Sequence, residues 1–298
     1  MIKPSDPGLS PSLILFIGVA AISTGAIFAR MAEAPALVVA AYRVGLATLV
    51  LAPITLIQSR RELMELSGRD LWMAALSGFF LAIHFAAWIS SLEYTSVANS
   101  VVLVNTNPIW VGILTPFLTH EAIRRSTLIG IGLSVCGAVI IGVGDIAIGS
   151  DALLGDGLAL VGSMAMAIYI LMGRNLRRKL SITAYVLLCY GSAAVILWGC
   201  VLLAGLPVTG FETKTWACFW GLALVSQVVG HSSFNWALRW LSAGVIAVAL
   251  LGEPVGATIL AYVLFGEGLT MFKIVGGVLI LSAIYITSMG ERNRERDK

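Results

Sequence analysis

Long apolar runs, separated by short segments that hold most of the charge, dominate this chain. About 20 consecutive apolar residues cross a bilayer as a helix, so these runs predict membrane-spanning helices. The runs lie at residues 12–30, 36–57, 70–91, 96–118, 126–143, 154–173, 182–204, 215–236, 243–265 and 272–289. The expected fold class is an all-α membrane protein with ten transmembrane helices.

The composition agrees with a lipid environment. Of the 298 residues 58% are hydrophobic and 12% are charged, whereas a soluble domain carries about 25% charged residues. A formal charge of +3 does not indicate a nucleic-acid partner, so the expected partners are the lipid bilayer and a small-molecule substrate. The four cysteines lie within or beside apolar runs, which favours packing over a disulfide or a metal site. No cofactor is expected.

The basic residues predict the orientation of the chain. If ten helices cross the membrane, 15 of the 19 lysines and arginines fall on the side that holds both termini. Since lysine and arginine accumulate in cytoplasmic loops, both termini, with tails at 1–11 and 290–298, are expected in the cytoplasm. The expected location is the cytoplasmic (inner) membrane, crossed many times.

The two halves of the chain resemble each other at a fixed shift of 146 residues. Apolar matches alone would carry little weight, but proline, glutamate and glycine match in the same register. The pairs include Leu92/Leu238, Ser96/Ser242, Pro108/Pro254, Ile113/Ile259, Leu118/Leu264, Glu121/Glu267 and Gly130/Gly276. The sequence therefore predicts two five-helix repeats, at 12–143 and 154–289.

Five is an odd number of crossings, so the second repeat must enter the membrane from the opposite side to the first. Inverted repeats are typical of alternating-access secondary transporters, which bind their substrate near the bilayer midplane between the two halves. The predicted architecture thus indicates a transporter.

The repeated segments resemble a known family. The stretch SLEYTSVANSVVLVNTNPIWVGILTPFLTHE and its counterpart WALRWLSAGVIAVALLGEPVGATILAYVLFGEGLT are similar to the two EamA-type repeats of the drug/metabolite transporter superfamily. The resemblance extends over about residues 12–289. It implies a secondary transporter, usually an exporter of amino acids or related small metabolites. It does not specify the substrate.

Two prolines mark matching positions in the two repeats. Glu253 precedes Pro254 about midway along one predicted helix, and Asn107 precedes Pro108 in its counterpart, close to Asn105. Proline interrupts helical hydrogen bonding, and paired interrupted helices point to a midplane binding site. We expect kinked or broken helices here and a substrate or proton role for Glu253. The alternative is that the prolines only shape the helices and that Glu253 bonds a neighbouring helix.

Further polar residues lie within the predicted helices, where ionisable groups are expensive and often functional. Arg43 either extends outward to the interface or pairs with Glu253 or a substrate carboxylate. His84 shares a helix face with Trp88, and His231 shares one with Asn235. Either histidine could instead be satisfied by a neighbouring carbonyl group. The candidate substrate and ion pathway comprises Arg43, His84, Trp88, Asn105, Asn107, Pro108, Tyr169, His231, Asn235, Glu253 and Pro254.

Other functions fit less well. Gly142-Val143-Gly144-Asp145 spells the GxGD motif of an intramembrane aspartyl protease, but no Tyr-Asp pair supplies a second aspartate, and no catalytic motif such as GxSxG occurs. We therefore expect no enzyme, with neither catalytic nor metal-binding residues. The favoured function is export of amino-acid-like solutes, with proton coupling as an option. Uptake or exchange, a lipid scramblase and a non-transporting scaffold stay open, as do the substrate and the oligomeric state.

Overall fold

The computed structural model describes residues 8–95, 97–119, 123, 125–143, 152–265 and 270–296. These ranges contain helices and connecting turns and no β-strand. The helices are α1 (Pro11–Ile22), α2 (Gly25–Met31), α3 (Ala36–Gln58), α4 (Arg60–Glu65), α5 (Gly68–Tyr94), α6 (Val97–Val104), α7 (Asn107–Leu118), α8 (Arg125–Val143), α9 (Ala152–Leu176), α10 (Ile182–Leu203), α11 (Thr213–Gly221), the π-helix η1 (Leu222–His231), α12 (Ser232–Ala237), α13 (Ala243–Leu250), α14 (Gly252–Phe265) and α15 (Met271–Arg296).

The helices form a bundle whose outer surface is apolar. Phe16, Leu49 and Val195 are exposed on it, while small residues such as Ala40 and Ala47 fill the interior. An outside as apolar as this suits lipid rather than water. Within the described ranges, five segments are long and apolar enough to cross a membrane: Pro11–Met31, Ala36–Gln58, Gly68–Tyr94, Leu153–Leu176 and Ile182–Leu203. The protein is an all-α membrane protein.

The first apolar run is not one continuous helix, contrary to the expectation from its hydropathy. It divides into α1 and α2 at Ser23 and Thr24, whose hydroxyl groups donate to the carbonyls of Val19 (2.8 Å) and Ala21 (2.7 Å). Such back-bonding competes with regular helical hydrogen bonds and bends helices. The break lies beside the middle of the bundle, where α1 packs against η1 and α12.

The two proline-marked segments are broken, as the sequence predicts, but the prolines are not inside kinked helices. Pro108 lies in the first turn of α7, after a turn at Asn105–Thr106, and Pro254 lies in the first turn of α14, after a turn at Leu251. The first turn of a helix has N–H groups without intrahelical partners, so proline costs little there. Each segment is therefore two half-helices in series.

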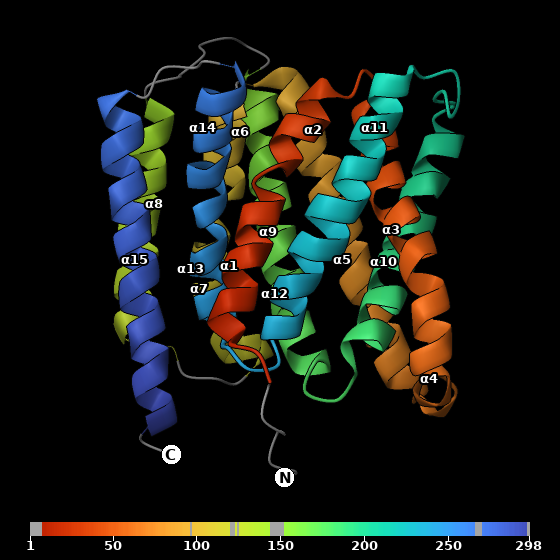
Figure 1. The fold of residues 1–298 in the computed structure, drawn as a ribbon, viewed down its shortest axis with the longest axis horizontal. Coiled ribbons are helices and arrows are strands. Elements are labelled where there is room, and N and C mark those ends of the chain that lie inside the picture. The colour runs from red at the N-terminus through yellow and green to blue at the C-terminus, as the bar shows by residue number, and fades with distance from the viewer. Residues whose placement is uncertain are drawn as a thin grey trace.

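Helices from the two halves of the sequence pack against each other throughout the bundle. In Figure 1, α8 and α15 lie together at one side, and α3 and α10 lie together at the other. Between these pairs, α5 packs against α9. Glycines allow the close approach: a Cβ atom added at Gly137 would lie 2.7 Å from the carbonyl oxygen of Gly276. Packing through small residues is typical of membrane helices.

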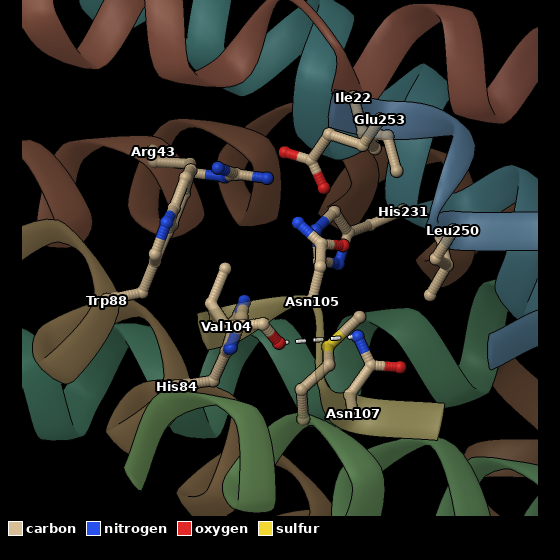
Figure 2. Close-up of a pocket in the computed structure, with 11 residues that line it drawn as sticks. Ile22, Arg43, His84, Trp88, Val104, Asn105, Asn107, His231, Leu250 and Glu253 are labelled. Carbon is tan, nitrogen blue, oxygen red and sulfur yellow. Dashed lines mark hydrogen bonds between the residues drawn. The ribbon is translucent and has the colours of Figure 1, made fainter. Parts of the chain in front are cut away.

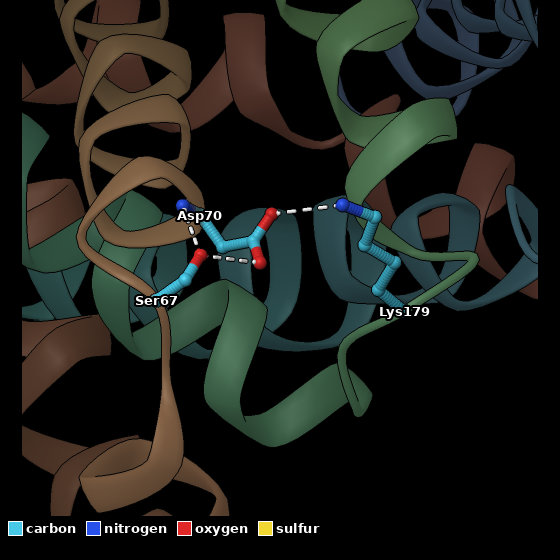
Figure 3. A network of polar contacts seen from close by, with 3 residues as sticks. All are labelled: Ser67, Asp70 and Lys179. Atoms are coloured by element: carbon cyan, nitrogen blue, oxygen red, sulfur yellow. Dashed lines mark hydrogen bonds and ion pairs between the residues drawn. The ribbon is translucent and has the colours of Figure 1, made fainter.

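A polar network joins α5 to the loop between α9 and α10 at one end of the bundle (Figure 3). The Ser67 hydroxyl accepts from the backbone N–H of Asp70 (3.1 Å), which caps the N-terminus of α5, and donates to the Asp70 carboxylate (2.8 Å). The Lys179 ammonium lies 3.1 Å from the same carboxylate. Because Lys179 is largely exposed, the cap contributes more to stability than the ion pair does.

Five residues named in the sequence argument lie outside the described residues. They are Ser96, Glu121 and Glu267, which belong to the matched pairs, and Gly144 and Asp145 of the GxGD stretch.

Candidate functional site

A small cavity lies in the middle of the bundle, beside the helix breaks. It is lined from both halves of the sequence, by Ile22, Arg43, His84, Trp88, Val104, Asn105, Asn107, Met166, His231, Leu250 and Glu253. Figure 2 shows these side chains converging from several helices on one space. The structure therefore brings together seven of the predicted pathway residues: Arg43, His84, Trp88, Asn105, Asn107, His231 and Glu253.

Arg43 of α3 supplies the positive charge of the cavity. Its side chain is 2% exposed, its Nε donates to Oε1 of Gln227 (2.8 Å), and its guanidinium lies 4.1 Å from the centre of the Phe85 ring. The prediction that Arg43 could extend outward to the interface is therefore wrong. The amide and the ring hold the guanidinium from the side, which fixes its direction inside the protein.

Glu253 supplies the negative charge, from the first turn of α14. Figure 2 shows its carboxylate and the Arg43 guanidinium directed toward the same space. Among the described residues no ion pair within 4 Å joins the two groups, so they face each other across the cavity.

The two histidines differ in their hydrogen bonding. His84 Nδ1 lies 3.0 Å from the carbonyl oxygen of Gly162, and because a carbonyl oxygen only accepts, Nδ1 is the donor. His84 is thus satisfied as a structural histidine would be, and its ring stacks on Trp88 at 6.0 Å, the expected i, i+4 contact. His231 Nδ1 is buried and has no partner among the described residues.

Two further polar atoms of the cavity walls are also buried without a partner in the described part of the chain. They are Oδ1 of Asn107, an acceptor, and Nε1 of Trp88, a donor. Within the described ranges the Asn107 side chain makes one hydrogen bond, a long one from Nδ2 to the carbonyl oxygen of Val104 (3.5 Å). Buried polar groups are almost always hydrogen-bonded, so the cavity presents unused hydrogen-bonding capacity beside its two charges.

Four predicted pathway residues do not line the cavity. Pro108 and Pro254 act on the backbone, at the half-helix starts. Asn235 lies behind the wall, where its Nδ2 donates to the hydroxyl oxygens of Tyr169 (2.5 Å) and Tyr190 (3.1 Å). The Nδ2 group of Asn235 and the two tyrosine hydroxyls thus form a buried scaffold behind the wall, while Oδ1 of Asn235 has no partner among the described residues.

Of the two predicted pathway residues Trp88 and Tyr169, Trp88 lines the cavity, whereas Tyr169 lies behind its wall and bonds to Asn235. Conversely, Gln227 was missed, because an uncharged amide within an apolar run does not stand out in a search for charges. The apolar lining residues Ile22, Val104, Met166 and Leu250 were missed for the same reason.

The cavity suits a small solute that carries both charges and polar groups. The cavity has a volume of only about 20 Å³, room for about one water molecule, so a larger solute requires the half-helices to separate. In the described residues no cluster of three or more histidine, cysteine, aspartate or glutamate side chains has the arrangement of a metal site. The charges of Arg43 and Glu253 and the unpaired polar atoms of the walls allow the cavity to recognise charge and hydrogen-bond direction.

The chain is similar to known proteins over most of its length. The model of the EamA-like transporter family matches residues 9–143 and again 153–289. A protein of Archaeoglobus fulgidus named an uncharacterized transporter is 28% identical over 239 residues, which are 77% of this chain and 80% of that protein. The uncharacterized transporter YetK of Bacillus subtilis is 28% identical over 236 residues, 74% of this chain and 69% of that protein.

A protein of known crystal structure is similar in fold, with a TM-score of 0.78 at 18% sequence identity, over 96% of this chain and 98% of the other. The family match occurs twice and covers most of the chain, and both relatives above carry the name of transporters. This chain belongs to the EamA-like transporter family, within the drug/metabolite transporter superfamily.

Proposed function

We propose that this protein is a secondary active transporter that exports small, amino-acid-like metabolites across the cytoplasmic membrane by alternating access. The observation that carries the proposal is the pair of opposite charges, Arg43 and Glu253, that face one cavity without an ion pair between them. A zwitterion fits both: its carboxylate binds the guanidinium, and its ammonium group binds the Glu253 carboxylate. The unpaired atoms of Asn107, Trp88 and His231 give further contacts.

The proposal includes ten transmembrane segments in two inverted five-helix repeats, at 12–143 and 154–289. The ten segments would be α1–α2, α3, α5, α6–α7, α8, α9, α10, α11–η1–α12, α13–α14 and α15. The pattern of helix contacts supports a pseudo-twofold relation. Segments five apart in this order are equivalent in the proposed repeats. The contact of the first segment with the eighth (α1 with η1) then corresponds to the contact of the sixth with the third (α9 with α5). In two further contacts, α3 with α10 and α8 with α15, equivalent segments pack against each other.

Both termini are proposed to lie in the cytoplasm. The supporting observation is that α4 and the α9–α10 loop, which are rich in arginine and lysine, belong to the same end of the bundle as the start of α1 (Figure 1). A basic cytoplasmic face follows the distribution of charge in membrane proteins.

The helix breaks supply the proposed movement. The α6–α7 and α13–α14 turns and the α1–α2 break all adjoin the cavity, and half-helices can tilt there without losing internal hydrogen bonds. Tilting one set of half-helices would open the contracted cavity to one side of the membrane. Glu253 would bind a proton when the solute is absent and the ammonium group of the solute when it is present, which couples export to proton entry.

The experiment is solute counterflow in proteoliposomes that contain the purified protein. The panel holds amino acids, amines without a carboxylate and carboxylic acids without an amine, each at two pH values. We expect amino acids to exchange, and we expect Glu253→Gln to slow exchange and remove its pH dependence, because a neutral amide neither binds a proton at this site nor attracts an ammonium group. Glu65→Gln, at an exposed glutamate, is the matched control.

A wild-type rate and pH profile in Glu253→Gln would contradict the role given to Glu253. Exchange of simple amines alone would contradict the zwitterion and leave an organic-cation transporter. If no solute moves and labelled lipid crosses the bilayer instead, the protein is a scramblase and the proposed function is wrong. Net accumulation with an imposed proton gradient of either sign decides between export and uptake.

A further inference from the structure

Gln227 lies on an unusual element. The helix that carries it, η1, is a ten-residue π-helix, in which the backbone N–H of Ser232 bonds to the carbonyl oxygen of Gln227. π-Helical turns are rare and occur frequently at functional sites. The buried residues of η1 include Ser226, Gln227, Gly230 and His231, so the face that carries Gln227 also carries a wall residue of the cavity.

The neighbours of η1 fix its position closely. Gly18 of α1 and Gly230 of η1 meet so tightly that a Cβ atom at Gly230 would lie 2.5 Å from the side chain of Ile22. The Ser226 hydroxyl lies 3.0 Å from that of Thr24, at the α1–α2 break. The Gln227 amide therefore stands on a backbone that is held in place independently of its bond to Arg43.

The Gln227 side chain is fully buried, and its two ends have different neighbours. Oε1 accepts the 2.8 Å hydrogen bond from Arg43 Nε. Nε2 has no hydrogen-bond partner within the described ranges. A guanidinium in a protein interior is usually paired with a carboxylate, but here the contacts to Arg43 come from a neutral amide and the Phe85 ring. The amide thus orients the guanidinium without neutralising it.

We infer that Gln227 is a positioning residue that makes the cavity selective for a carboxylate. It turns the outer edge of the Arg43 guanidinium toward the cavity and leaves its charge to be balanced by the bound solute, and Nε2 is a further donor beside it. A glutamate here would hold Arg43 equally well but would supply the missing negative charge itself. The inference rests on the proposed function in one respect, that the cavity is the substrate site.

The test compares Gln227→Glu with wild type in two measurements. The first is the shift in thermal unfolding of the purified protein in detergent on addition of propionate, with propionamide as the neutral probe and chloride holding the ionic strength constant. Propionate is expected to stabilise wild type more than propionamide does, and Gln227→Glu is expected to lose this difference. Val225→Ala, which truncates an exposed side chain of the same π-helix, is the matched control and should keep this difference.

The second measurement is counterflow of L-leucine and of isopentylamine, which is leucine without its carboxylate. For leucine, Gln227→Glu should raise the half-saturation concentration about tenfold or more with little change in maximal rate, because a charge pair at the site is lost. For isopentylamine, Gln227→Glu should not raise the half-saturation concentration. This split separates positioning from a structural role, since a misfolded cavity would lower the maximal rate for both solutes.

Equal stabilisation of wild type and Gln227→Glu by propionate, or no stabilisation of wild type, would overturn the inference. A propionate effect that depends on Gln227, in a protein that moves neither leucine nor isopentylamine, would support the carboxylate site and contradict the proposed transport of amino-acid-like solutes. The two proposals therefore fail in different measurements.

Discussion

Two arginines of this protein are equally buried, but their replacement should affect different properties: stability in one case and transport in the other. Arg43 and Arg177 are each 2% exposed. Arg177 donates from Nε to the carbonyl oxygen of Asn235 (3.0 Å) and from Nη1 to that of Leu180, and thereby ties α12 to the end of α9. Burial lowers the pKa of Arg177 to about 10, so it still carries its charge at neutral pH. Arg43 contacts a single amide and a ring beside the cavity.

The magnitudes follow from these contacts. Arg177→Met removes two charge-assisted hydrogen bonds to backbone, each contributing about 1.5–3 kcal/mol. The free energy of unfolding should fall by about 3–6 kcal/mol, which lowers Tm on the order of 10 °C in a chain of this size. Arg43→Met removes one such bond and a cation–π contact of up to about 2 kcal/mol. It also removes the cost of burying an unpaired guanidinium, which is several kcal/mol.

The net change for Arg43→Met should therefore lie within about 2 kcal/mol of zero, a Tm shift of no more than about 5 °C. Transport of carboxylate-bearing solutes should nevertheless fall at least about 100-fold, because the counter-charge of the solute is gone. The assays are thermal unfolding followed by the fluorescence of the eight tryptophans, and counterflow in proteoliposomes. A drop in Tm for Arg43→Met as large as that for Arg177→Met would refute the reasoning and make Arg43 part of the scaffold.

Two other predictions concern packing and orientation. A Cβ atom at Gly78 would lie 1.9 Å from the Ser192 hydroxyl oxygen and 2.2 Å from a backbone carbonyl oxygen of α10. Gly78→Ala should therefore separate α5 from α10 and lower the free energy of unfolding by about 1–3 kcal/mol, measured as a drop in Tm. An unchanged Tm would contradict the close contact. The orientation can be tested by cysteine labelling in a background with the four native cysteines replaced. A membrane-impermeant maleimide should label Lys214→Cys in intact cells and Arg61→Cys only after permeabilisation. The reverse pattern would place both termini outside.

Much of the site could be predicted from the sequence because its residues violate the rule of an apolar interior. Arg43 and Glu253 are charges within apolar runs, and the Asn107-Pro108 pair matches Glu253-Pro254 in the other repeat. Each such residue is costly in a membrane helix, so each is informative alone. The structure places all of them except the prolines on one cavity.

The parts that escaped prediction depend on tertiary contacts. The break between α1 and α2 has no proline, and it comes from hydroxyl groups whose alternative bonds a hydropathy profile does not register. The break also leaves room for the Arg43 guanidinium, because a Cβ atom added at Gly25 would lie 3.6 Å from Arg43 Nη1. Likewise, nothing local marks residues 222–231 as a π-helix rather than an α-helix, because that choice depends on packing against α1 and α3.

The distribution of charge between the repeats bears on how the proposed transporter would work. The paired half-helices, at which we propose that movement occurs, lie at matching positions in the two matches of the family model. The charges do not: Arg43 belongs to the first match of the family model, and Glu253 to the second. A symmetric scaffold gives the two facing states similar energies. Because each end of the proposed zwitterion would be bound by a different half, the solute itself would hold the halves together when the cavity is closed, and its release at either side would require only that one charge pair separate first.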